Sequence, residues 1–202
     1  MIKSQSNEIS LEALRLGDQA EFARLVDAYS GPIYRLGLRM LGNEQDAEDV
    51  LQNTFLSTLT HISGFEGRSS LSTWLYRIAA NEALMLIRRR KPEVNLDDFG
   101  PGDSENDVTT LQFVDWSGLP ESELLSEEGR KLLDQAIQSL PEALRMVFVL
   151  RDIEGVSIRE TAEALGLTET NVKTRLLRAR LNLREKLSTY YSERFIREER
   201  ND

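Results

Sequence analysis

The fold is decided by a stretch near the C-terminus, residues 157–187, which reads SIRETAEALGLTETNVKTRLLRARLNLREKL. Its first four residues have the form of a capping box, Ser157 followed three positions later by Glu160, so a helix is expected to begin there. Gly166 can adopt the left-handed conformation that ends this short helix, and Thr168 can cap the next one. The pattern predicts two helices joined by a tight turn, inside a helical module that spans residues 141–187.

The second helix of this module combines an apolar stripe with basic side chains. Apolar residues at helical spacing are expected to be buried: Val172, Leu176, Ala179 and Leu183. The remaining positions are polar or basic: Asn171, Lys173, Thr174, Arg175, Arg178, Arg180 and Arg184. A scaffold helix, a turn and a capped basic helix are typical of a helix-turn-helix that enters the major groove of DNA. We expect base contacts from its first two turns and phosphate contacts from Arg180 and Arg184. The alternative, a solvated basic face, explains the charge but not the order of the elements.

The net charge of −9 is unevenly distributed. Residues 92–129 contain eleven acidic side chains and no lysine or arginine, so this one segment carries more negative charge than the chain as a whole. The remainder is close to neutral and locally basic. Such asymmetry, together with several glycines and prolines, indicates a flexible linker between two folded parts.

The N-terminal part also has helical periodicity. Ser10, Asp18 and Asn43 are expected to cap helices, and Gly31-Pro32 is expected to interrupt one. The helix that follows Asn43 has an expected apolar stripe of Ala47, Val50, Leu51, Thr54, Phe55 and Leu59. A loop is expected over residues 61–70, followed by a helix that ends in the basic run at residues 88–91. We therefore predict an all-α protein with two small helical domains, residues 8–91 and 126–190, joined by a flexible acidic linker at 92–125.

Composition excludes several classes of function. The chain has no cysteine and a single histidine, His61, which leaves too few ligands for a zinc or haem site and removes the commonest general base. We expect no metal, no cofactor and no enzymatic activity. The N-terminus lacks the apolar segment of a secretion signal, and no window approaches a membrane span. A cytoplasmic protein without direct membrane insertion is expected.

Three blocks of residues resemble the extracytoplasmic-function (ECF) sigma factors of bacterial RNA polymerase. Residues 46–55 (DAEDVLQNTF) are similar to the helix with which that family binds core polymerase. Residues 65–81 resemble its promoter-melting segment, and residues 140–183 resemble its promoter-reading C-terminal domain. The likeness covers nearly all of residues 11–187. It departs from the usual pattern at Asn53, where a glutamate is common, and at Met85, where an aspartate is common.

The resemblance implies a role for each matching residue. Contact with the β′ clamp helices of core polymerase is implied for Asp46, Asp49, Gln52, Asn53 and Phe55. Phe65 and Asn81 would hold a base flipped out of the −10 element, while Arg77 and Arg88 would lie along the DNA backbone. The −35 element would be read by Lys173, Thr174, Leu177 and Arg178, with Asn171 and Arg175 beside them. The implied partners are core polymerase (β′ clamp helices and β flap), promoter DNA and an anti-sigma protein, at the bacterial nucleoid.

Other interpretations remain open from the residues alone. Phe65 could be a loop residue that fills the core, Asn81 could simply face solvent, and the acids near Asn43 could only stabilise a helix start. A stand-alone helix-turn-helix regulator with an N-terminal sensor or dimerisation domain is the alternative function. Such a regulator would bind a symmetric site as a dimer and would have no need of the segment from Phe65 to Asn81.

Overall fold

The computed structural model describes residues 9–90 and 127–199, and within these ranges it contains helices and no strand. The N-terminal group is α1 (Leu11–Arg15), α2 (Gln19–Leu41), α3 (Glu44–His61), the 3-10 turn η1 (Ile62–Gly64) and α4 (Leu71–Arg90). The C-terminal group is α6 (Glu127–Gln138), α7 (Glu142–Phe148), the π-helical turn η4 (Val149–Ile153), α8 (Ile158–Leu165) and α9 (Glu169–Glu199). The all-α prediction is confirmed. The expected acidic linker, residues 92–125, lies outside the described residues.

Helix starts in the N-terminal group follow the predicted capping residues. The side chain of Asp18 accepts a hydrogen bond from the Glu21 amide (3.0 Å), and that of Asn43 accepts one from the Asp46 amide (3.1 Å). Ser10 caps α1 in the same way. Each cap satisfies an amide that lacks an intrahelical partner, so local sequence alone positions these helix starts.

The predicted interruption at Gly31-Pro32 is wrong. Helix α2 continues through both residues as a single element of 23 residues. A proline inside a helix removes one hydrogen bond and costs about 3 kcal/mol. Leu25, Ile33 and Leu36 are fully buried on either side of Pro32. Packing of these side chains against α3 and α4 is worth about 1.5–3 kcal/mol each, so tertiary contacts outweigh the local penalty.

The C-terminal group contains an irregular turn that the sequence did not predict. After α7 the helix widens into η4, where the Glu154 amide donates to the Val149 carbonyl (2.9 Å). Such π-type turns are rare and reorient the side chains around them. As a result the neighbouring acids Asp152 and Glu154 are aimed at different partners, Arg180 on α9 and Arg35 on α2.

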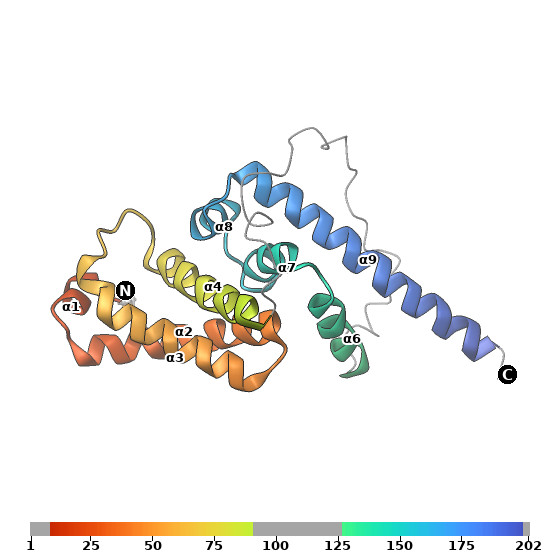
Figure 1. Ribbon diagram of the computed structural model, residues 1–202, viewed down its shortest axis with the longest axis horizontal. Helices are drawn as coiled ribbons and strands as arrows, with labels where there is room; N and C mark the ends of the chain where they lie inside the picture. The colour runs from red at the N-terminus through yellow and green to blue at the C-terminus, as the bar shows by residue number, and fades with distance from the viewer. Residues whose placement is uncertain (1–8, 91–126, 200–202) are drawn as a thin grey trace, which may run out of the picture.

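The two groups lie against each other (Figure 1). Helix α8 packs on α4, and α6, α7 and η4 contact α2. Helix α9, the long blue helix of Figure 1, packs on α6, α7 and α8 and continues past residue 190 to Glu199. The predicted domain boundaries at 91 and 126 remain predictions.

Candidate nucleic-acid interface

Helices α8 and α9 have the local geometry expected of a helix-turn-helix. The Ser157 hydroxyl accepts from the Glu160 amide (3.2 Å) while the Glu160 carboxylate accepts from the Ser157 amide (3.2 Å), which completes the capping box. Because the Ser157 hydroxyl also bonds the carboxylate, the pKa of Glu160 is lowered. Gly166 ends α8 with φ +67°, and the Thr168 hydroxyl accepts from the Asn171 amide (3.1 Å). The turn is therefore fixed by residues identified from sequence.

The α9 residues predicted to read the −35 element fall into an accessible set and a buried set. Lys173 is exposed, and Thr174, Leu177 and Arg178 are half-buried along one side of the helix. Asn171 and Arg175, also predicted to face DNA, are only 6% and 1% exposed. These two are buried because they lie on the side of α9 that carries the buried stripe of Val172, Leu176, Ala179 and Leu183. The accessible face predicted to read bases is accordingly narrower than the sequence indicated.

Arg180 is held within the domain. Its guanidinium makes two hydrogen bonds of 2.8 Å to the Asp152 carboxylate, and these bonds raise its pKa. A bidentate pair of this kind occupies the donors that a phosphate would need. Arg184, one turn further along, is exposed and better placed for the predicted phosphate contact.

Helix α3 presents a mixed polar and apolar face. Asp49, Gln52 and Asn53 are exposed, as predicted for residues that bind a partner. Leu56 and Leu59 lie beside them with 54% and 55% of their surface exposed. Leu59 was predicted to be in the core, and that prediction is wrong because the helix turns it away from α2 and α4.

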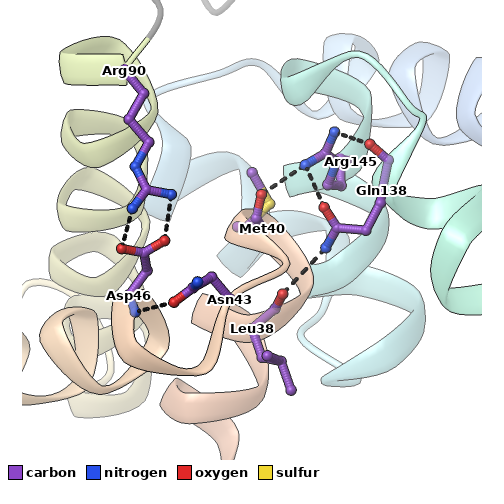
Figure 2. Close-up of polar contacts among 7 residues, drawn as sticks. All are labelled: Leu38, Met40, Asn43, Asp46, Arg90, Gln138 and Arg145. Carbon is purple, nitrogen blue, oxygen red and sulfur yellow. Dashed lines mark hydrogen bonds and ion pairs between the residues drawn. The ribbon is translucent and has the colours of Figure 1, made fainter.

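Two other residues predicted on this surface are structural. Phe55 is 9% exposed and packs edge-to-face on Phe22, with ring centroids 6.3 Å apart. Asp46 is 6% exposed and forms a bidentate ion pair with Arg90, the last residue of α4 (Figure 2). The geometry thus favours an internal role for both side chains.

Helix α4 carries the residues predicted to contact the −10 element. Arg77 and Asn81 are exposed, Met85 is 41% exposed and Arg88 is half-buried, at spacings that align them on one face. Phe65 is 7% exposed, and its ring lies 5.0 Å from that of Trp74. Trp74 and Asn81 share a face about 10 Å apart along the axis. The structure therefore places Arg77, Asn81 and Arg88 on one face of α4 and leaves Phe65 in the core.

The remaining chemistry is sparse in the part of the chain that the structure describes. Within it, no group of three or more His, Cys, Asp or Glu side chains could hold a metal ion. No helix within residues 9–90 or 127–199 is long and apolar enough to cross a membrane.

The two groups of helices match two known families. Sigma-70 region 2 matches residues 25–93, and Sigma-70, region 4 matches residues 130–183. The ECF RNA polymerase sigma factor SigW of Bacillus subtilis is 39% identical over 177 residues, which cover 88% of this chain and 94% of SigW. The chain belongs to the ECF RNA polymerase sigma factors. The ECF RNA polymerase sigma-E factor of Escherichia coli K12 is 33% identical to this sigma factor over 183 residues, covering 89% of it and 93% of the relative.

Solved structures share the fold of this sigma factor. CnrH in complex with the cytosolic domain of CnrY aligns with a TM-score of 0.64 at 24% identity, covering 89% of this chain and 95% of that one. The sigma factor RpoE in complex with the anti-sigma factor NepR from Bartonella quintana aligns with a TM-score of 0.59 at 21% identity, covering 83% and 97%. At these identities the likeness supports the fold alone.

Sequence reasoning missed one candidate residue of this sigma factor. Leu56 is an exposed leucine that follows Asp49 and Gln52 on the same face of α3. The signal was present, because residues 49, 52 and 56 recur at helical spacing on the side opposite the apolar stripe.

Proposed function

We propose that this sigma factor binds core RNA polymerase and directs initiation at promoters that it recognises through a −35 and a −10 element. The observation that carries the proposal is the position of three solvent-facing stripes, on α3, α4 and α9, within the two matched regions. The α3 stripe combines polar and apolar side chains, which suit a protein partner, and the α4 and α9 stripes contain polar and basic side chains, which suit DNA. Family membership decides against the stand-alone regulator.

The α3 stripe is proposed to bind the β′ clamp helices. Asp49, Gln52 and Asn53 supply hydrogen-bonding groups, and Leu56 supplies an apolar side chain that would be buried in a complex. An exposed apolar residue surrounded by polar ones is typical of a protein–protein contact. The β flap is proposed as the second polymerase contact, made by the C-terminal domain.

The α4 stripe is proposed to engage the −10 element of the non-template strand. Asn81 can hydrogen-bond the edge of an unstacked base, and Arg77 and Arg88 can contact phosphates on either side of it. The half-buried ring of Trp74, which packs against Phe65, lies about two turns before Asn81 on this face. A captured base needs a polar group for its edge and an apolar wall for its face, and these residues supply both.

The α9 stripe is proposed to read the −35 element in the major groove. Lys173 and Arg178 can donate to guanine, Thr174 can bond either partner of a base pair, and Leu177 can contact a thymine methyl group.

The acidic segment, residues 92–125, is proposed to thread toward the polymerase active-site cleft in place of nucleic acid. These roles place the sigma factor in the cytoplasm, at the nucleoid.

A cognate anti-sigma protein is the third proposed partner. Two solved structures with this fold contain a protein partner: CnrH is bound to the cytosolic domain of CnrY, and the sigma factor RpoE is bound to the anti-sigma factor NepR. An anti-sigma protein would be recovered by co-purification of the full chain from its own bacterium.

Transcription in vitro tests the proposal. Core polymerase from the same bacterium, with and without the purified chain, is given a fragmented genomic library, and start sites are mapped. We expect a discrete set of start sites that depends on the chain and shares two upstream sequence elements. Absence of any chain-dependent start site would falsify the proposed function.

A further inference from the structure

Helix α4 has one exposed face. Helices α2, α3 and α8 pack on α4, and between Leu71 and Arg88 only Arg77, Asn81 and Met85 are exposed. These three residues recur every four positions, so they form a single row along the helix. Two of them are polar, whereas Met85 is a large apolar side chain with 41% of its surface exposed. The contacts proposed above for the −10 element give Met85 no role.

Met85 differs from two other methionines of the chain. Met40 and Met146 are at most 1% exposed and lie in the core, as methionine usually does. A single exposed apolar side chain is nevertheless common on protein surfaces and indicates nothing by itself. The residues around Met85 must therefore decide whether it serves a function.

The neighbours of Met85 give the exposed face of α4 two different edges. At about 100° per residue, three apolar side chains project roughly 20–60° to one side of Asn81: Trp74, Ile78 and Met85. At the same spacing, Arg77 and Arg88 project roughly 20–40° to the other side. Asn81 therefore lies between an apolar edge (Trp74, Ile78 and Met85) and a basic edge (Arg77 and Arg88).

This division suits one DNA strand better than a duplex. A helix in the groove of a duplex has a phosphate backbone on either side, so basic residues would be expected at both of its edges. An unpaired strand has one backbone, and its unstacked bases can lie on apolar side chains. The basic edge of α4 can bind the phosphates of such a strand while the apolar edge contacts its bases.

Met85 follows Asn81 by one turn, about 6 Å along the helix axis, so it can contact a base adjacent to the one that Asn81 is proposed to hold. Thymine is the DNA base whose edge carries an apolar group, the C5 methyl group. The flexible thioether of methionine adapts well to such a group. We infer that Met85 is a specificity-determining residue that selects thymine next to the base held by Asn81, through contact with the thymine methyl group. The inference rests on the proposed function.

Removal of one methyl group from the DNA tests this contact. Uracil differs from thymine only in lacking the C5 methyl group, so its hydrogen-bonding groups are unchanged. Promoter DNA with an unpaired non-template strand at the −10 element is given thymine or uracil at each −10 position in turn. Because this strand is already unpaired, the cost of melting does not enter the measurement. Binding of holoenzyme, made from core polymerase and the full chain, is followed by fluorescence anisotropy.

We expect uracil to weaken binding at one position by about fourfold, the effect of leaving one methyl group unburied. This position should be adjacent to the one at which Asn81→Ala abolishes base preference. At the other positions thymine and uracil should bind equally.

Two substitutions at Met85 separate an apolar contact from general damage. Met85→Gln keeps the length and the helix propensity of the side chain but replaces its apolar end with an amide. It should reduce the fourfold preference to none, at the affinity that the wild type has for uracil. Met85→Leu keeps an apolar end and should retain the preference. Leu16→Gln is the matched control, since it makes a similar change at a leucine that is 83% exposed at the end of α1, and its preference should equal that of the wild type.

The possible outcomes distinguish this inference from the proposed function. Equal binding of thymine and uracil at every position, or a preference that survives Met85→Gln, overturns the inference alone. Loss of affinity of Met85→Gln for core polymerase without DNA would also overturn it, because Met85 would then contact polymerase. If core polymerase binds the promoter DNA equally well with and without the chain, the proposed function is contradicted and the inference fails with it.

Discussion

Leu56 offers a test of the proposed polymerase-binding surface that separates binding from folding. Its side chain is 54% exposed, so Leu56→Ser removes little packing and should change the free energy of unfolding by no more than about 0.5 kcal/mol. Full burial of a leucine side chain is worth about 1.5–3 kcal/mol. If a complex covers the exposed half, the loss on substitution is about 0.8–1.5 kcal/mol, a four- to thirteenfold increase in Kd for core polymerase by the usual conversion.

The assay is a fluorescence-anisotropy titration of the labelled full chain with core polymerase, with urea unfolding in parallel. Leu16→Ser is the matched control, since this leucine is 83% exposed at the end of α1 and has no proposed partner. It should alter neither binding nor stability. A Kd for Leu56→Ser equal to that of the control would refute the assignment of this α3 face to polymerase.

Three further predictions address the α4 surface, the α9 surface and the buried Tyr76. Asn81→Ala should impair open-complex formation, measured by permanganate footprinting, with little change in core binding; normal opening would remove Asn81 from base capture. Arg178→Ala should cost about 1–3 kcal/mol in a gel-shift assay of holoenzyme and relax preference at one −35 position, whereas an equal loss on every promoter would indicate a phosphate contact. Burial raises the pKa of Tyr76 from 10.0 to about 12, so the folded state favours its neutral form. Its contribution to stability should therefore be complete below pH 10 and be lost as the pH rises toward 12, because the unfolded chain loses the Tyr76 proton first. Urea unfolding should therefore show a decline over that window that Tyr76→Phe reduces, and an identical decline in the variant would contradict the assignment.

Local signals were read correctly from the sequence because they depend on a few adjacent residues. The caps at Asp18, Asn43 and Ser157 and the left-handed Gly166 all have the predicted conformation. The buried stripe of α9 was also predicted, since its spacing is set by the helix itself. Fold class follows from such patterns.

Contacts between distant segments were beyond the sequence. Asp46 looked like a helix-start acid or a polymerase contact, yet its carboxylate pairs with Arg90, 44 positions away. Asn171 and Arg175 are buried because of the helices that pack beside α9. Helix α2 continues through Pro32 because of the helices that pack against it. Nothing in the sequence around Arg145 predicted that its guanidinium would donate to the Met40 carbonyl near the end of α2. Each of these outcomes is decided by tertiary packing, which overrides local propensity.

Promoter-dependent initiation is the claim on which the other roles depend. The most direct measurement is run-off transcription by core polymerase with the purified wild-type chain and, in parallel, with the Asn81→Ala and Arg178→Ala variants, with every start site mapped. We predict start sites that appear only with the chain and that share two upstream elements. In each variant these start sites should be used less, because the substituted residue is proposed to contact one of the two elements. Start sites that are the same with and without the chain would contradict the account.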